Sequence, residues 1–201
     1  MCLLTNTIFW FMKRLVIFAS GSGTNAENII RFFQDHNNVS VHAVLTNNPH
    51  AKVLDRCKKL NVSALSFNRK AFYDDVIVLN VLKDLNPDLI ILAGFLWKFP
   101  ESILSLFPNK VINIHPALLP KYGGKGMYGR YVHEAVVKNK EPETGITIHY
   151  VNEQYDEGAI IFQTTCEVSL NATVENVAAK IHELEMEHFP KIINSLLFPN
   201  E

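Results

Sequence analysis

Short runs of aliphatic and β-branched residues alternate with helix-like patterns along most of the chain, and this alternation restricts the fold more than any other feature. Leu15 to Ala19 is a continuous apolar run that ends at a glycine-rich turn, as is typical of a buried parallel strand. Asp88 to Ala93, with the sequence DLIILA, is the most apolar run and is expected at the centre of the sheet. Such alternation predicts right-handed βαβ units. We therefore expect an α/β fold with an open, mostly parallel twisted sheet, helices on both faces and a Rossmann-like N-terminal half.

The expected elements follow one another without a repeat or a linker that would divide the chain. Strands are expected at 15–19, 39–45, 62–67, 88–93 and 111–114, and helices at 25–35, 51–60, 70–85, 100–107 and 130–138. After these elements, 145–151 and 159–168 indicate two antiparallel strands of a hairpin near the C-terminus. A last helix is expected at 174–197, interrupted near Pro190 because proline lacks a backbone N–H.

The length of 201 residues favours a single domain, which we expect at 13–201 behind an N-terminal extension at 1–12. The extension is apolar, but it is too short to span a bilayer. Its flanking charges, Lys13 and Arg14, follow the apolar run, whereas a signal peptide carries them in front. Cys2, Cys57 and Cys166 include no Cys-x-x-Cys pair and predict free thiols in a reducing compartment. We expect a cytoplasmic protein.

The charge balance restricts the kind of partner. A formal net charge of −1 gives no global basic field for a nucleic acid. The eight histidines include no His-x-x-x-His pair, so the sequence offers no metal site. Small-molecule substrates are therefore expected, with no nucleic acid, membrane or metal, in a monomer or a homodimer.

A glycine-rich turn, Ser20-Gly21-Ser22-Gly23-Thr24-Asn25, follows the first expected strand. Its glycines allow a close approach to an anion, and the next helix presents unpaired N–H groups and the positive end of its dipole. The end of the second strand, residues 46–49, carries no carboxylate for the ribose of a dinucleotide. A single phosphate monoester fits this turn better, although a purely structural turn is the alternative interpretation.

Three polar residues are candidates for catalysis. Asn113 and His115 alternate along one expected strand, so both side chains point to the same side, and Pro116 ends the strand directly afterwards. An amide and an imidazole aimed together form a credible oxyanion-binding pair, although a packed structural histidine is the alternative. Asp156, in the loop of the expected hairpin, is the candidate carboxylate to orient His115, and a solvated turn residue is its alternative interpretation.

Five motifs together resemble those of the folate-dependent formyltransferase family, and specifically its phosphoribosylglycinamide formyltransferase branch. They are Ser20-Gly-Ser-Gly-Thr-Asn25, Leu92-Ala-Gly-Phe95, Asn113-Ile-His-Pro-Ala-Leu-Leu-Pro120, Gly145-x-x-x-His149 and Asp156-x-Gly158. The resemblance covers about Lys13 to Pro190. The motif around His115 occurs in all folate-dependent formyltransferases and hydrolases of this fold, and the glycine-rich turn indicates the glycinamide ribonucleotide branch.

The resemblance implies a set of site residues by matching position. Its phosphate-binding turn falls on Gly23, Thr24 and Asn25, and the amine end of the nucleotide meets Glu185. Its catalytic groups fall on Asn113, His115 and Asp156. Its folate contacts fall on Arg69, Leu96, Trp97, Lys98, Phe99 and Asn113. Two features depart from the family: the segment 121–131 is longer than usual, and Trp97-Lys98 replaces a commoner hydrophobic–arginine pair.

The activity implied is transfer of the formyl group of 10-formyltetrahydrofolate, a co-substrate, to the amine of 5-phosphoribosylglycinamide in purine biosynthesis. Asn113 would donate to the oxygen of the tetrahedral intermediate, an imidazolium His115 would stabilise it, and Asp156 would keep His115 charged and relay the amine proton through water. A formyltetrahydrofolate hydrolase and a non-catalytic phosphosugar-binding module are the alternatives. A tRNA-directed formyltransferase would need a further nucleic-acid-binding domain.

Overall fold

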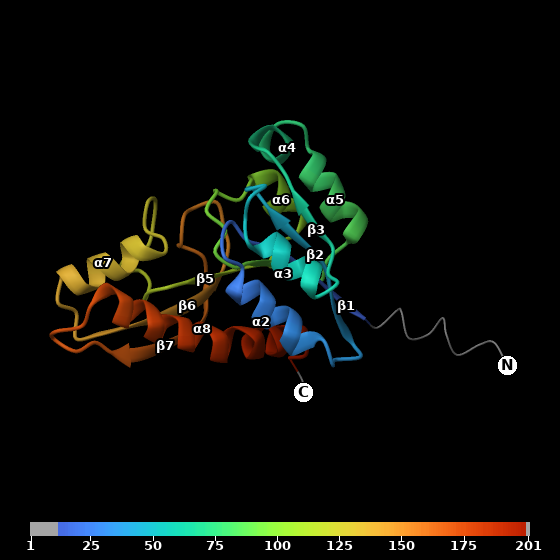
Figure 1. Cartoon of the computed structure of the whole chain (residues 1–201). Helices are drawn as coiled ribbons and strands as arrows, with labels where there is room; N and C mark the ends of the chain where they lie inside the picture. The colour runs from blue at the N-terminus through green and yellow to red at the C-terminus, as the bar shows by residue number, and fades with distance from the viewer. Residues whose placement is uncertain (1–11, 200–201) are drawn as a thin grey trace.

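The computed structural model describes residues 12–199, which form one sheet flanked by helices (Figure 1). The strands are β1 (Lys13–Phe18), β2 (Val39–Thr46), β3 (Ala64–Ser66), β4 (Leu89–Leu92), β5 (Val111–His115), β6 (Glu143–Tyr150) and β7 (Ile160–Glu167). The helices are α2 (Thr24–Phe33), α3 (Val53–Lys59), α4 (Arg69–Tyr73), α5 (Ile77–Leu85), α6 (Glu101–Leu106), α7 (Arg130–Lys138) and α8 (Val174–Leu197). The predicted extension at 1–12 lies almost wholly outside the described residues, so the division of the chain there stays a prediction.

The sheet confirms the predicted fold class. In the described part of the chain, its order is β3-β2-β1-β4-β5-β6-β7, which puts the very apolar β4 in the middle as expected. The pairs from β3 across to β5 are all parallel. Strand β6 is antiparallel to β5, and β7 is antiparallel to β6, so the hairpin extends one side of the sheet beside α7 (Figure 1).

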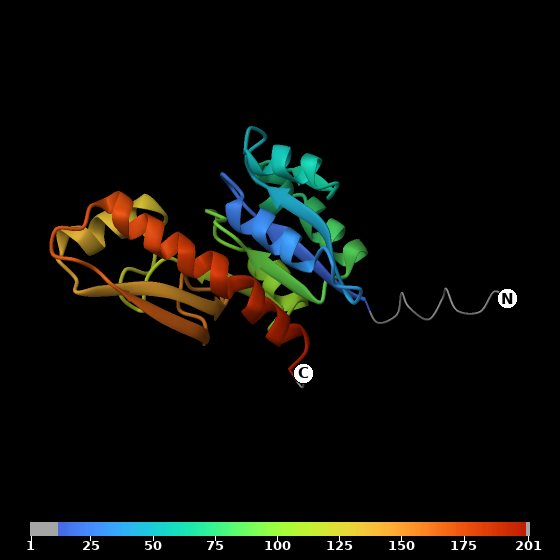
Figure 2. The same cartoon turned by 60° about the horizontal axis from the view of Figure 1, so that its bottom comes forward.

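Two apolar clusters, one on each face, hold the helices against the sheet. On one face, α2 and α8 bury Ile29, Phe33, Ile181 and Phe189 against strand residues such as Ile17. Figure 2 shows these two helices crossing the sheet side by side. On the other face, α4, α5 and α6 pack around Phe18 and the remaining strand residues. Burial of strand side chains on both faces explains why the strands of the parallel half have continuous apolar sequences.

The single helix predicted at 70–85 is wrong: the structure has two helices, α4 and α5. The side chain of Asn68 caps α4 by accepting a bond from the Ala71 N–H at 2.9 Å. The helix ends at Asp74-Asp75, whose backbone N–H groups both bond to the carbonyl of Lys70. Aspartate is a poor helix former, and its charge is unfavourable at a helix C-terminus. Val76 then adopts a left-handed backbone (φ 51°), which turns the chain into α5.

The interruption predicted near Pro190 is also wrong, because α8 continues through this residue. A proline inside a helix leaves the carbonyl four residues earlier without its usual N–H partner. Here the Asn28 side chain on α2 donates to that carbonyl, Met186 O, at 2.8 Å. A contact from a neighbouring helix therefore replaces the lost bond, while Pro190 itself is buried in the helix packing.

Two further observations concern the thiols and the membrane. Cys57 and Cys166 are free cysteines, as predicted, and Cys2 lies outside the described residues. No helix within residues 12–199 combines the length and apolarity that a bilayer crossing needs.

Candidate active site

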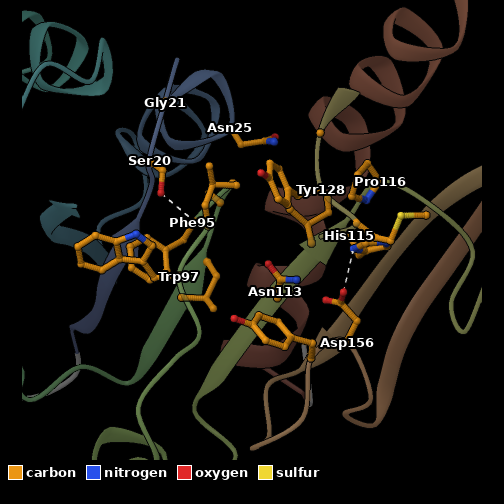
Figure 3. Close-up of a pocket in the computed structure, with 18 of the residues that line it drawn as sticks. Ser20, Gly21, Asn25, Phe95, Trp97, Asn113, His115, Pro116, Tyr128 and Asp156 are labelled. Carbon is orange, nitrogen blue, oxygen red and sulfur yellow. Dashed lines mark hydrogen bonds and ion pairs between the residues drawn. The ribbon is translucent and has the colours of Figure 1, made fainter. Parts of the chain in front are cut away.

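A cavity of about 740 Å³ opens beyond the carboxyl ends of β1, β4 and β5. In open α/β sheets this is the edge where ligands bind. The predicted phosphate turn, the segment after β4 and the predicted catalytic residues all line it, as does Glu185 from α8. Figure 3 shows Asn25, Asn113 and His115 directed into the same space, with Trp97 on its far side. Of the predicted site residues, Arg69 is outside this lining.

The glycine-rich turn is held tightly between β1 and α2. Gly23 has a left-handed backbone (φ 73°) and precedes α2, whose first N–H groups have no intrahelical acceptors. The Val53 side chain packs so closely on Gly23 that no Cβ fits there. The Ser20 hydroxyl accepts a bond from the Leu96 N–H at 3.0 Å, which ties this turn to the segment after β4. The arrangement suits a phosphate at the start of α2.

Asn25 and Glu185 meet where α2 and α8 line the cavity. The Asn25 Nδ2 donates to Glu185 Oε2 at 2.9 Å, while Asn25 Oδ1 is buried and has no partner within residues 12–199. His182 lies one helical turn from Glu185, with 3.8 Å between Nδ1 and Oε2, and this contact raises the pKa of His182. Glu185 and Asn25 Oδ1 both accept hydrogen bonds, so this part of the cavity suits a ligand rich in donors.

Asn113 is oriented by His149, its direct cross-strand partner on β6. His149 Nδ1 lies 2.8 Å from the carbonyl of Tyr150, which only accepts, so Nδ1 carries a proton. In the neutral ring, Nε2 then accepts from Asn113 Nδ2 at 3.1 Å. One amide hydrogen of Asn113 is used in this bond, and the other is available to a ligand oxygen.

His115 and Asp156 come together although they are far apart in the sequence. Their closest atoms, His115 Nδ1 and Asp156 Oδ2, lie 3.6 Å apart, and both side chains are largely buried (Figure 3). On the other side of the ring, Nε2 lies 2.7 Å from the carbonyl of Tyr122. The Gly124 N–H donates to Asp156 Oδ2 at 2.9 Å. The segment 121–131, which is longer than is usual in the family that the motifs resemble, therefore contacts both groups through its backbone.

Burial and charge act in opposite directions on these two groups. Burial lowers the pKa of His115, although the Asp156 carboxylate and the Tyr122 carbonyl both act to raise it. Burial alone would raise the pKa of Asp156, but contacts with His149, His115 and the Gly124 N–H together lower it. The carboxyl is therefore ionised at neutral pH. The uncharged imidazole is favoured more than in water, against the expectation that Asp156 keeps His115 charged, because burial outweighs the attraction of the carboxylate.

An aromatic wall borders the side of the cavity opposite the glycine-rich turn. Trp97 and the buried Phe99 belong to the segment after β4 and pack with Phe95. Arg69 lies just outside the cavity, where its guanidinium stands over the rings of Tyr73 at 4.9 Å and Trp97 at 5.9 Å. A flat aromatic ligand with an anionic end would match this side.

Sequence reasoning missed several residues that line the cavity or support it. His149 was noted only as part of a motif, although strand alternation and its pairing with Asn113 assign it to this site. His133 on α7 also lines the cavity; burial lowers its pKa, and its Nδ1 has no partner in the described part of the chain. Within residues 12–199, no three His, Cys, Asp or Glu side chains cluster as metal ligands would.

Several known proteins resemble this chain in sequence and in fold. The sequence model of the family described as formyl transferase matches residues 13–193. A phosphoribosylglycinamide formyltransferase of Bacillus subtilis is 32% identical over 92% of this chain and 95% of that protein. The chloroplastic phosphoribosylglycinamide formyltransferase of Arabidopsis thaliana is 33% identical over 92% of this chain, which spans 65% of that longer protein. The crystal structure of phosphoribosylglycinamide formyltransferase from Bacillus halodurans superposes with a TM-score of 0.83 at 33% identity, covering 94% of this chain and 97% of that one.

Proposed function

The chain belongs to the formyl transferase family, within its phosphoribosylglycinamide formyltransferases, and we propose on that basis a reaction for its cavity. The cavity transfers the formyl group of 10-formyltetrahydrofolate to the amine of 5-phosphoribosylglycinamide. One observation carries this proposal: an amide, an imidazole and a carboxylate line the same cavity as a glycine-rich turn. That turn leads into a helix N-terminus and is suited to a phosphate. We retain a cytoplasmic location and a monomeric or homodimeric state as predictions.

In this proposal the nucleotide lies along α2. Its phosphate binds the backbone at Gly23, Thr24 and Asn25, where the unpaired N–H groups and the helix dipole favour an anion. The rest of the nucleotide then extends toward Glu185, whose carboxylate and the neighbouring Asn25 Oδ1 accept bonds from its amine end. Its amine reaches the space in front of Asn113.

The folate enters from the opposite side. Its pterin packs against the backbone of Leu96 to Phe99 and the aromatic side chains there. The Arg69 guanidinium, exposed beside the cavity mouth, is suited to a carboxylate at the distal end of the co-substrate.

The chemistry is an acyl transfer between two nitrogens. The amine lone pair attacks the formyl carbon, and the electron pair of the C=O bond moves to the oxygen, which accepts a hydrogen bond from Asn113. As that oxygen becomes negative, the nearby His115 gains affinity for a proton. The proton lost by the amine passes through water to the Asp156–His115 pair and on to the folate nitrogen as the C–N bond to the folate breaks. The products are the N-formyl nucleotide and tetrahydrofolate.

A spectrophotometric assay of the full chain tests the proposal. The protein is mixed with 10-formyltetrahydrofolate, with and without 5-phosphoribosylglycinamide, and tetrahydrofolate release is measured. Release that depends on the nucleotide is expected. Release without the nucleotide would instead indicate a hydrolase, and nucleotide binding without any release would indicate a binding module. His115→Ala should abolish turnover while nucleotide binding, measured by calorimetry, stays within about twofold of wild type.

A further inference from the structure

The backbone of the segment 121–129 contacts both members of the proposed proton-transfer pair. The Tyr122 carbonyl lies 2.7 Å from His115 Nε2, and the Gly124 N–H donates to Asp156 at 2.9 Å. Tyr122 and Gly124 both have left-handed backbones, with φ of 57° and 93°. This conformation brings a carbonyl and, two residues later, an N–H to two neighbouring side chains.

The Tyr122 carbonyl determines which nitrogen of His115 carries the proton. A carbonyl only accepts, so Nε2 must donate to it, and in the neutral ring Nδ1 then carries a lone pair. That lone pair faces Asp156 Oδ2 at 3.6 Å, longer than a hydrogen bond. In the neutral ring, two acceptors thus face each other with no proton between them. This is an open position for one proton, which the pair can accept during the reaction.

Without the Tyr122 carbonyl, the other tautomer would be preferred. A proton on Nδ1 would donate to Asp156, and the lone pair would move to Nε2 on the far side of the ring. The position between His115 and Asp156 would then already be filled in the resting protein. The Tyr122 carbonyl is therefore needed to keep that position open.

The side chain of Tyr122 holds this carbonyl in place. Its hydroxyl donates to Glu141 Oε1 at 2.7 Å and accepts from Asn139 Nδ2 at 2.7 Å, beyond the end of α7. A left-handed backbone at a non-glycine residue is strained, so the conformation at Tyr122 persists because its surroundings enforce it. The phenol is thus fixed at one end while the carbonyl contacts His115 at the other.

We propose that Tyr122 is a positioning residue: its anchored phenol holds its own carbonyl on His115 Nε2 and so keeps the proton position between His115 and Asp156 open. The inference rests on the proposed function for its catalytic consequence. The hydrogen-bonding part of it holds whatever the reaction is.

The test compares Tyr122→Phe with Lys121→Met. Tyr122→Phe keeps the ring and removes both hydroxyl bonds. Lys121→Met removes the exposed ion pair between Lys121 and Glu141, at 3.2 Å, and leaves the phenol in place. Nitrogen NMR of the histidine ring reports the tautomer directly and does not depend on activity. We expect His115 of the wild type and of Lys121→Met to be protonated at Nε2, and Tyr122→Phe to show a larger share of the Nδ1–H form.

Kinetics provide the second measurement. Tyr122→Phe should lower kcat about tenfold, while KM for both substrates stays within about twofold, because proton transfer and not binding is affected. The pKa of His115 should also fall in Tyr122→Phe, since the carbonyl contact raises it. An Nδ1–H tautomer in the wild type, or an unchanged tautomer and kcat in Tyr122→Phe, would overturn the proposal. A changed tautomer in a protein without transferase activity would leave the positioning role and refute the proposed function.

Discussion

Replacement of Gly23 by alanine tests whether the glycine-rich turn, the proposed phosphate site, is confined by packing as well as by its backbone conformation. At Gly23, φ is 73°, and an added Cβ would lie 2.8 Å from Val53 Cα and closer still to the Val53 side chain. Two other glycines of the cavity separate these effects. Gly94 has the same φ of 73° with nothing near its Cβ position, and Gly21 has neither a positive φ nor a close neighbour.

The expected losses of stability follow from these three environments. A left-handed alanine costs about 1–2 kcal/mol, and the lower entropy of the unfolded chain returns about 0.4–1 kcal/mol. Gly94→Ala should therefore lower the free energy of unfolding by about 0–1.6 kcal/mol. Gly23→Ala adds an overpacking term of about 1–3 kcal/mol, for a total of about 1–4.6 kcal/mol. Gly21→Ala should be neutral or stabilising by up to about 1 kcal/mol.

Urea unfolding followed by circular dichroism measures this series, and calorimetry with 5-phosphoribosylglycinamide measures binding. Gly23→Ala should also weaken nucleotide binding by about tenfold or more, equivalent to about 1.4 kcal/mol. The reason is that the substitution displaces the backbone N–H groups of the turn. Equal stabilities of Gly23→Ala and Gly94→Ala would show that Val53 does not confine the turn. Nucleotide affinity unchanged in a destabilised Gly23→Ala would remove the turn from phosphate binding.

Three further predictions concern catalysis, helix packing and pH. Asn113→Ala should lower kcat about 10²–10³-fold in steady-state assays with little change in nucleotide KM, and near-normal kcat would exclude an oxyanion role. Asn28→Ala should lower the free energy of urea unfolding by about 1 kcal/mol, but by clearly less in a Pro190→Ala background, where the restored N–H bonds the same carbonyl. Burial lowers the pKa of the His115 imidazole from its usual 6.5. The uncharged His115 therefore contributes fully to stability above pH 6.5, and this contribution declines as the pH falls toward the pKa of His115 in the folded protein. His115→Asn should therefore flatten the loss of stability measured between about pH 7.5 and 5.5, and an unchanged slope would contradict the shift.

Local sequence pattern was sufficient to predict most of the fold. Apolar runs bounded by turns identified the strands, and the strongest of them, Leu89–Leu92, is central because both of its faces are covered. The predicted bounds of α7, Arg130 to Lys138, agree with the structure. These features depend on periodicity within one segment, which a single sequence displays directly.

The two errors in the fold have different causes. Nothing in the sequence near Pro190 indicates that Asn28, from another helix, supplies the missing donor, so a distant element decided the outcome there. The break within 70–85 is local: Asp74 and Asp75 are poor helix formers, and Val76 adopts a left-handed backbone that turns the chain into α5. The apolar pattern on both sides of these residues concealed that break.

At the site, too, local sequence pattern predicted some features, and contacts between distant segments decided others. Strand alternation brought Asn113 and His115 to one edge, but the partners that fix their orientation come from β6 and from the segment after Pro120. His149 is recognisable only once the register of β5 against β6 is known. The Tyr122 contact is made by a backbone carbonyl, to which the identity of the residue gives no direct clue.

Burial of His115 gives the proposed reaction a source of selectivity for the transition state. An imidazole that was charged at rest would already attract the neutral carbonyl of the substrate, and the part of an interaction that is equal in the ground state and the transition state does not speed the chemical step. Burial instead holds the pKa of His115 down in the resting protein, with Asp156 and the Tyr122 carbonyl opposing it. Negative charge that develops on the formyl oxygen then raises the proton affinity of the pair at the moment when the amine releases its proton. Charge on His115 therefore increases together with the charge that it stabilises, and the preorganised site favours the tetrahedral intermediate over the bound substrates.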